Sequence, residues 1–178
     1  MRSNIKPIIY IFIALSLISL LFVNDTSIDT SIRVFFSPNG GCTKAIVYEI
    51  MKAKTVILVQ AYSFTSKEIA NALAQAKNTG IDVEIILDKS NESLKYSAAD
   101  FAAHMGIPTY IDPAHNIAHN KVMIIDNETV ITGSFNFSKA AEEHNAENLL
   151  IFKSREIAKK YINNWNIHLS HSYKYTAR

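Results

Sequence analysis

Two basic residues near the middle of the sequence have the types and spacing needed to act on a phosphate ester. His119 and Lys121 lie two residues apart, at the start of the apolar run 122–125. Alternate residues of a β-strand share a face, about 6–7 Å apart. The imidazole can therefore attack phosphorus while the ammonium group neutralises charge on the phosphate oxygens. Asp126 follows the run, where Asp126-Asn127 favours a turn, and we expect it to support the geometry or charge of the site.

Three further polar residues complete this candidate site. Ser134 and Asn136 again alternate along the chain, so they can present two neutral donors to further phosphate oxygens. Glu147 follows just before another apolar run. Its carboxylate can accept a hydrogen bond from an imidazole Nδ1–H and stabilise the positive charge of the ring. Glu142 and Glu143 lie close by in sequence and are alternatives for this acid.

A sheet is needed to bring these residues together, and the pattern of the chain predicts one. Apolar runs and alternations indicate strands at 32–36, 55–62, 83–87, 108–111, 121–125, 129–132 and 149–152. Helical spacing and capping residues indicate helices at 43–53, 65–77, 98–104 and 154–168. Strands and helices alternate at first, and several strands then follow one another. We therefore expect an α/β fold with a mixed β-sheet flanked by helices.

The N-terminus differs in character from the rest of the chain. Arg2 and Lys6 precede the uncharged run 7–23, PIIYIFIALSLISLLFV. A basic segment followed by an apolar one is typical of a secretory signal. The run is long for a cleaved signal, just short of the ~20 residues that span a bilayer, and no clear cleavage pattern follows. We predict that residues 1–23 are a signal peptide or membrane anchor and that residues 24–178 form one secreted or periplasmic domain, membrane-anchored if the leader is kept.

The charge of the predicted domain is balanced. The first 23 residues hold two of the 18 Lys and Arg residues and none of the 16 Asp and Glu residues, which leaves 16 of each. A strongly basic domain would favour a nucleic-acid ligand, and this domain has no such excess. Four lysines remain candidates for a local basic patch or a solvated face: Lys139, Lys153, Lys159 and Lys160.

The sequence predicts no metal site. Cys42 is the single cysteine, so it is expected to be a small buried residue. His115 and His119 form H-x-x-x-H, which on a helix would align two zinc ligands. Asn116 stands where metalloproteases carry Glu, and the segment is not predicted to be helical, so His115 is interpreted as a loop residue near the site. The other histidines are assigned elsewhere: His104 and His144 to the surface, His168 and His171 to a polar C-terminal tail.

Together these residues resemble the signature of the phospholipase D superfamily, H-x-K-x4-D followed by G-S-x-N. The matching residues are His119, Lys121 and Asp126, then Gly133, Ser134 and Asn136. Glu147 occupies the place of the superfamily's histidine-orienting acid. The resemblance extends over most of residues 32–168 and implies a phospholipase D-like fold with one motif per chain.

The resemblance also implies how the site works. Larger members carry the signature twice, whereas this chain carries it once, like small bacterial members that include secreted phospholipases D and a periplasmic endonuclease. A two-fold homodimer with the active site at its interface is implied, because two histidines are needed. One His119 forms a phosphohistidine, and the partner subunit's His119 protonates the leaving oxygen and then activates water. Lys121, Ser134 and Asn136 bind the phosphate, and no metal or other cofactor is needed.

The substrate has two interpretations. An exported, neutral domain favours phosphatidylcholine-type phospholipids at a membrane surface, cleaved to phosphatidic acid and free head group. Phe135 and Phe137 flank Asn136 and could contact lipid, although alternation with the polar residues would equally place them in the core. The small single-motif architecture instead favours a nonspecific, metal-independent endonuclease that cleaves DNA or RNA. We predict the phospholipase D; a non-catalytic phosphate-binding module is the remaining alternative.

Overall fold

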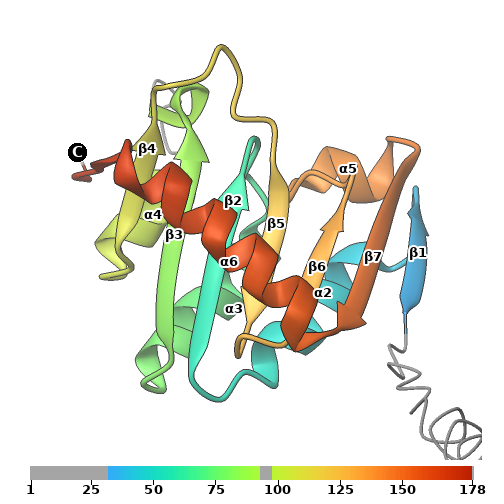
Figure 1. Cartoon of the computed structure of the whole chain (residues 1–178). Helices are drawn as coiled ribbons and strands as arrows, with labels where there is room; N and C mark the ends of the chain where they lie inside the picture. Colours follow the sequence, from blue (N-terminus) through green and yellow to red (C-terminus); the bar gives the residue numbers. More distant parts are fainter. Residues whose placement is uncertain (1–31, 93–97, 178) are drawn as a thin grey trace, which may run out of the picture.

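One mixed sheet organises the described residues, 32–92 and 98–177, of the computed structural model. Its strand order is β1-β7-β6-β5-β2-β3-β4-β8 (Figure 1). The strands are β1 (Arg33–Ser37), β2 (Val56–Ala61), β3 (Asp82–Asp88), β4 (Thr109–Asp112), β5 (Lys121–Ile125), β6 (Thr129–Gly133), β7 (Glu147–Lys153) and β8 (Tyr173–Lys174). Neighbours β2, β3 and β4 are parallel, and the other neighbouring pairs are antiparallel. The predicted mixed sheet is confirmed, whereas the leader predicted at 1–23 lies outside the described residues.

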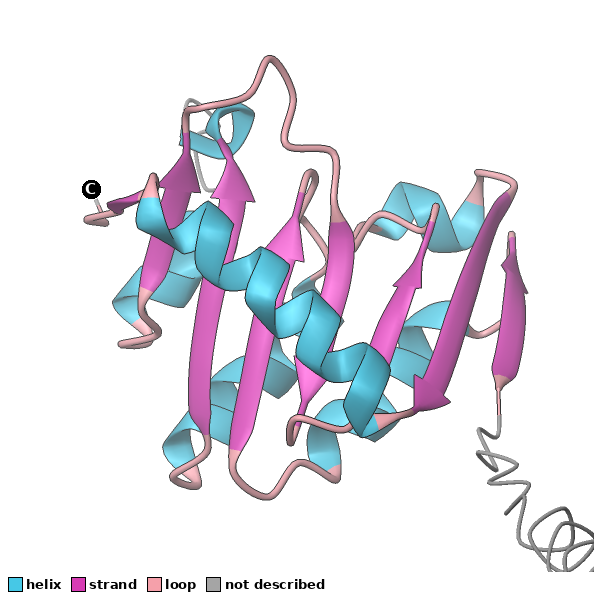
Figure 2. Cartoon of the chain, in the orientation of Figure 1, coloured by secondary structure: helices cyan, strands magenta, loops and turns pink. Residues whose placement is uncertain are grey.

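Helices cover both faces of this sheet (Figures 1 and 2). One face carries α2 (Cys42–Met51), α3 (Lys67–Asn78) and α4 (Ala98–His104), and the long α6 (Arg155–Ser170) crosses the other. Three short elements were not predicted: the 3₁₀ helix η1 (Lys89–Glu92), helix α5 (Lys139–Glu143) and strand β8. None of the helices in the described ranges is long and apolar enough to cross a membrane.

The central strands are buried on both faces, which explains their nearly continuous apolar sequences. Every residue of β5 is buried. Met123 and Ile125 pack into the core beneath α2 and α3, whereas Val122 and Ile124 pack into the core beneath α6. Alternate residues of one strand thus fill two cores, as expected for a strand between two helical layers.

Helix α6 reaches further along the chain than the sequence suggested. Its N-cap Ser154 accepts a hydrogen bond from the backbone N–H of Ile157, and Trp165 donates from Nε1 to the carbonyl oxygen of Val59 in the middle of the sheet. The helix then includes His168, and His171 is its C-cap residue. The assignment of these two histidines to a polar tail is wrong, because the helix end packs against β4 rather than fraying into solvent.

Candidate active site

The sheet brings the start of β5, the end of β6 and the start of β7 to one edge, the upper edge in Figure 1. His119 lies two residues before β5, and Lys121 is its first residue. Ser134 directly follows β6, and Glu147 opens β7. Strands β5, β6 and β7 are consecutive antiparallel neighbours. His119 and Glu147 therefore share this edge although they are 28 positions apart in the sequence. Strand β2, which is antiparallel to β5, ends at the same edge, with Ala61 opposite Lys121.

His119 is exposed and rests against an aromatic ring. The ring centroids of His119 and Tyr62 lie 4.6 Å apart with a tilt of 56°. Tyr62 directly follows β2 and donates its backbone N–H to the carbonyl oxygen of Asn120. Its own carbonyl oxygen accepts a bond of 2.6 Å from Asn91 Nδ2. Tyr62 was not predicted as a site residue, although its place directly after a buried strand was a signal that could have identified it.

Lys121 is a buried cation beside this histidine. Its Nζ donates to the carbonyl oxygen of His119 at 3.1 Å and lies 5.0 Å from the centroid of the Tyr62 ring. Burial lowers the pKa of Lys121, and the negative charge of Glu147 opposes part of that change. An ammonium group has three donors, so Lys121 can hold a substrate oxygen while it keeps its bond to the backbone.

Ser134 and Asn136 have the hydrogen-bonding capacity of ligand-binding groups. Ser134 is exposed, and its Oγ accepts bonds from the backbone N–H and Nδ2 of Asn148, at 3.0 and 3.3 Å. Its own O–H is therefore available as a donor. Among the described residues, the buried Oδ1 of Asn136 has no hydrogen-bond partner. Leaving such an acceptor unpaired costs roughly 1–3 kcal/mol, and it requires a donor such as water, whereas Nδ2 of the same amide can donate to a phosphate oxygen.

The two phenylalanines that flank Asn136 anchor the loop in the core. Phe135 and Phe137 are fully buried, and the carbonyl oxygen of Phe137 accepts the backbone N–H groups of Thr65 and Ser66. The suggested contact of these phenylalanines with lipid is therefore wrong. Gly133 is required where β6 passes β7, because a Cβ there would lie 2.3 Å from the carbonyl oxygen of Asn148.

Glu147 is the acid that faces the site. Asn145 Nδ2 donates to its Oε1 at 3.3 Å, and its charge acts on Lys121. The alternatives have other partners. Glu142 accepts the backbone N–H groups of Gly41 and Thr43, and Glu143 pairs with Lys139 at 3.5 Å.

Asp126 lies at the opposite end of β5, away from His119. Its carboxylate accepts the backbone N–H groups of residues 54–56 and the hydroxyl of Thr55, at 2.8–3.3 Å. Burial raises the pKa of Asp126, but these hydrogen bonds outweigh it, and the net pKa is lowered. The structure therefore does not bring Asp126 into the site, where the signature had placed it. It fixes the β5–β6 turn to the segment before β2, a supporting role in geometry.

A second carboxylate, not predicted from the sequence, holds the backbone just before the histidine. Asp88 ends β3, is buried, and accepts the backbone N–H of Ala118 at 2.7 Å and that of Ser90 at 2.9 Å. Burial raises the pKa of Asp88, but the hydrogen bonds lower it by more, so the net pKa is below its usual value. An ionised group thus fixes the residue that precedes His119.

This arrangement can bind and attack a phosphodiester. An exposed imidazole lies beside a buried ammonium group, and a hydroxyl and a carboxamide follow on the neighbouring loop. Each of the last three can contact a phosphate oxygen, which leaves the imidazole to approach phosphorus.

Known proteins resemble this chain in sequence and fold. The family model described as cardiolipin synthase, PLD-like domain, matches residues 46–168. Phospholipase D of Rickettsia conorii is 42% identical over 154 residues, 86% of this chain and 77% of that protein. The crystal structure of the phospholipase D family member Nuc from Salmonella typhimurium has a TM-score of 0.80 and 38% identity, covering 84% of this chain and 100% of its own. NucT from Helicobacter pylori has a TM-score of 0.77 and 26% identity, covering 83% and 100%. The predicted fold is thereby confirmed.

Proposed function

This chain belongs to the phospholipase D family and is a phosphoric diester hydrolase; from that premise we propose that it is an exported phospholipase D acting on phosphatidylcholine-type lipids. The convergence of His119, Lys121, Ser134 and Asn136 at one sheet edge carries the proposal. The products are phosphatidic acid and the free head group. The apolar leader, residues 1–23, directs export and, where it is retained, holds the domain at a membrane.

The reaction proceeds in two displacements at phosphorus. His119 attacks, a P–N bond forms, and the P–O bond to the head group breaks. Lys121, Ser134 and Asn136 hold the other phosphate oxygens and neutralise their charge. The partner subunit's His119 protonates the leaving oxygen and then removes a proton from water, which breaks the P–N bond and releases phosphatidic acid.

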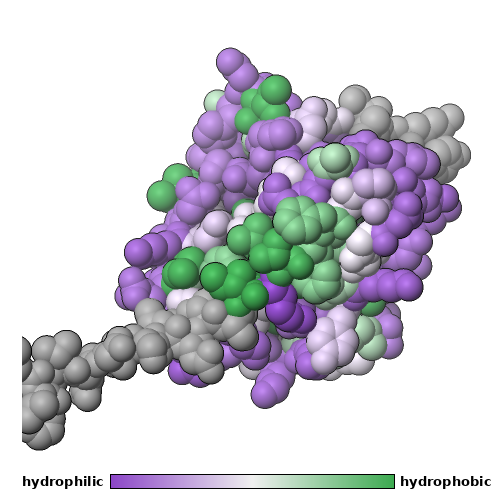
Figure 3. All heavy atoms as spheres, turned by 90° about the vertical axis from the view of Figure 1, so that its right-hand side faces the viewer, coloured by the Kyte–Doolittle hydropathy of each residue, from purple (hydrophilic) through white to green (hydrophobic). Residues whose placement is uncertain are grey.

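A second copy of the chain is the partner that this mechanism needs. The edge strand β1 exposes an apolar row next to β7: Ile32, Val34 and Phe36 are 57%, 49% and 66% exposed. Figure 3 shows apolar side chains gathered on this face. Phe36 lies opposite Asn148, whose side chain bonds Ser134, so the row borders the site. We propose that a two-fold contact covers this row and brings two copies of His119 together.

Two observations favour a lipid over a nucleic acid. Ile117 is 57% exposed two residues before His119, where it can contact apolar parts of a substrate. The candidate basic patch is largely neutralised within the chain, by the ion pairs Lys139–Glu143, Lys153–Glu128 and Lys160–Glu156. Lys153 is the last residue of β7, and Lys159 and Lys160 lie in the first half of α6. All three are away from the sheet edge that carries His119.

The direct test is choline release from phosphatidylcholine in mixed micelles by the full-length protein in excess EDTA, with His119→Asn as the paired variant. Release by the wild type alone supports the proposal. No release by either protein contradicts it for this lipid. The same two proteins are then added to plasmid DNA, where nicking by the wild type alone would identify an endonuclease.

The dimer is tested separately by light scattering of the same preparations. Phe36→Glu places a charge in the apolar row and is expected to yield monomers with little activity. A dimeric and active Phe36→Glu protein would contradict the proposed interface. His104→Glu, at an exposed position at the end of α4, is the control and should remain dimeric.

A further inference from the structure

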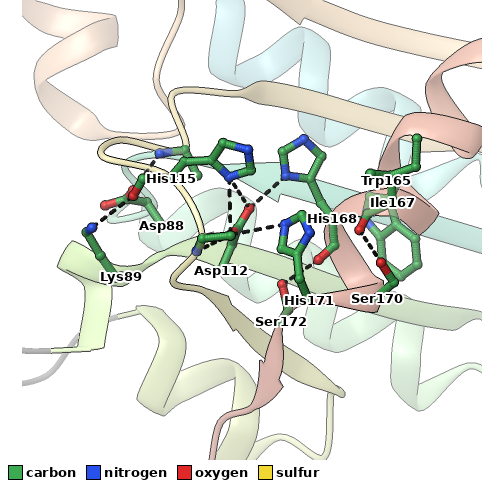
Figure 4. Close-up of polar contacts among 12 residues, drawn as sticks. Asp88, Lys89, Asp112, His115, Trp165, Ile167, His168, Ser170, His171 and Ser172 are labelled. Carbon is green, nitrogen blue, oxygen red and sulfur yellow. Dashed lines mark hydrogen bonds and ion pairs between the residues drawn. The ribbon is translucent and has the colours of Figure 1, made fainter.

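Three histidines and an aspartate meet at the end of β4, outside the catalytic set (Figure 4). Asp112 is the last residue of β4, and His115 lies in the loop between β4 and β5. His168 is in the last turn of α6, and His171 is the C-cap of that helix. One nitrogen of each ring and a carboxylate oxygen of Asp112 all lie within 4.8 Å of one another.

The carboxylate is at the centre of this cluster. Asp112 Oδ2 lies 2.7 Å from His168 Nδ1 and 3.3 Å from His115 Nδ1, and Oδ1 lies 3.3 Å from His171 Nε2. The ring centroids of the three histidines are 4.9–5.3 Å apart. Exposure rises outward: the Asp112 side chain is 0% exposed, His168 12%, His171 31% and His115 45%. The cluster therefore opens to solvent on the side of His115.

Hydrogen bonding within the chain does not account for this number of histidines. One protonated imidazole is enough to neutralise one buried carboxylate, and further positive rings at these distances would repel one another. Within the described part of the chain, the buried Nε2 of His171 has no hydrogen-bond partner, because its 3.3 Å contact with Asp112 lacks suitable geometry. Three ring nitrogens thus converge on one anionic oxygen pair, and one of them is unsatisfied.

We propose that Asp112, His115, His168 and His171 bind one zinc ion. Imidazole and carboxylate together are typical zinc ligands, whereas calcium and magnesium prefer sites built from oxygen alone. At about 2.1 Å from zinc, tetrahedral ligands lie roughly 3.4 Å apart. This is close to the 3.3 Å between His115 Nδ1 and Asp112 Oδ2, whereas the 2.7 Å contact of His168 Nδ1 with the same oxygen must lengthen when the ion binds.

The ligand spacing suits chelation by two rigid elements. Asp112 and His115 are three residues apart in a turn held by the bond from the Ala114 backbone N–H to Asp112 Oδ1. His168 and His171 are also three residues apart, one helical turn at the end of α6. The C-terminus of a helix favours a cation through its dipole, so both elements present the cluster with suitable geometry and charge.

The ion has a structural role and goes beyond the proposed function. All four positions of a tetrahedral zinc are taken by the chain, as in structural rather than catalytic zinc sites. It joins the C-terminal end of α6 to the loop that continues into Ala118 and His119. Hydrolysis by His119 does not pass through it.

Zinc titration of the full-length, tag-free protein, stripped with EDTA and kept in a nonionic detergent, tests the site. Calorimetry should give one zinc per chain, and saturation should raise the melting temperature by about 5–10 °C. Cobalt, as a spectroscopic substitute, should show the intense visible absorption of a tetrahedral ion. A protein that binds no zinc would overturn the proposal.

Two variants locate the ion. His115→Gln, at the most exposed ligand, should fold and lose zinc affinity by at least about tenfold; Asp112→Asn should lose it further, along with the shift in melting temperature. His104→Gln, on the exposed end of α4, is the matched control and should bind as the wild type does. Unchanged binding by His115→Gln would place the ion elsewhere and overturn the site.

His119→Asn separates this proposal from the proposed function. It should bind zinc with unchanged affinity while failing to release choline. The wild type should remain active in EDTA below the melting temperature of the zinc-free protein. Loss of zinc binding in His119→Asn would mean that the ion belongs to the catalytic edge, and would refute the separate site even where the lipase activity is confirmed.

Discussion

The two ends of β5 both carry ionisable side chains, but these are held in opposite ways. At one end, the Asp126 carboxylate is saturated by the N–H groups of residues 54–56 and a hydroxyl. At the other, the His119 ring is exposed and contacts Tyr62, and Lys121 is buried with a single carbonyl bond of 3.1 Å. One end has used its hydrogen-bonding capacity within the chain, and the other keeps it for a substrate.

This difference separates stability from activity along one strand. A saturated carboxylate contributes to the free energy of folding, whereas donors left unpaired at a sheet edge cost stability and serve binding. Changes at the Asp126 end should therefore alter unfolding and leave catalysis unchanged. Changes at the His119 end should do the reverse.

Replacing the nucleophile should have the largest effect. His119→Ala is expected to lower kcat by at least about 10³-fold, because the attacking atom is lost. Its melting temperature should stay close to that of the wild type, since the ring is exposed. Hydrolysis of a small chromogenic phosphodiester measures kcat without assuming a lipid substrate. His144→Ala, an exposed histidine at the end of α5, should keep full activity; comparable losses in both variants would contradict the assignment.

Removing the buried cation should come next. Lys121→Met keeps the aliphatic stem but removes the charge that stabilises the phosphate oxygens. We expect kcat to fall by about 10²–10³-fold, the usual consequence of losing one transition-state donor. The same assay serves, with Lys139→Met on neighbouring α5 as the matched control. A Lys121→Met enzyme within a few-fold of the wild type would exclude direct contact with the phosphate.

At the opposite end, Asp126→Asn should affect folding. The amide loses the charge that strengthens bonds to residues 54–56, and we expect a loss of about 1–3 kcal/mol in the free energy of unfolding, with kcat changed less than about twofold. Because the folded pKa of Asp126 is lowered, this stability difference is full near neutral pH and is lost as pH falls through that pKa. Urea unfolding near pH 7 and near pH 3 measures it.

Glu156→Gln makes the same chemical change on the exposed first turn of α6 and should shift stability by less than about 0.5 kcal/mol. If Asp126→Asn instead abolished activity in a stably folded protein, the contrast between the two ends of β5 would fail.

The electrostatic partner of Lys121 should have a smaller, pH-dependent effect. Glu147→Gln removes the charge that raises the pKa of Lys121, so burial would lower that pKa further. Since protonated Lys121 is required, the alkaline limb of the pH–rate profile should move to lower pH, with at most about a tenfold loss near neutrality. An unchanged profile with a large uniform loss would instead indicate that Glu147 orients the imidazole directly.

The smallest effect is expected at the aromatic ring beneath the site. Tyr62→Leu loses the ring contact with His119 and the interaction with the Lys121 ammonium group, which is of order 0.5–2 kcal/mol. A drop in kcat of about two- to tenfold should follow. Tyr62→Phe keeps the ring and should be nearly unchanged; equal losses in both variants would point to the phenol hydroxyl instead.

Much of the fold could be predicted because apolar runs and helix-capping residues lie within short segments of the sequence. Strands such as β2 and β5 are nearly continuous apolar runs, and the Ser66 and Ser154 caps mark where helices begin. The short elements α5 and η1 were missed because four or five residues carry too little periodicity. Within the candidate site, His119, Lys121, Ser134 and Asn136 could be predicted because their types and spacing match the signature, although only Lys121 lies within a strand.

Other features depended on contacts between distant segments. Asp126 matched the signature, yet its partners lie about 70 residues earlier in the chain, so only the folded sheet shows that it is an anchor. Tyr62, after β2, and Asp88, at the end of β3, come to His119 and Ala118 from strands that are distant in sequence, so only the folded sheet shows these contacts.

The sequence by itself thus determined the longer elements and the candidate reacting groups, because hydrophobic periodicity and residue chemistry are properties of neighbouring residues. Only the tertiary structure decided which of those groups meet. It separated Asp126 from His119, and it brought His168 and His171 from α6 onto Asp112 at the end of β4. The physical reason is that burying both faces of one sheet fixes the positions of all the strand and helix ends at once, and this long-range packing is not written in any single segment.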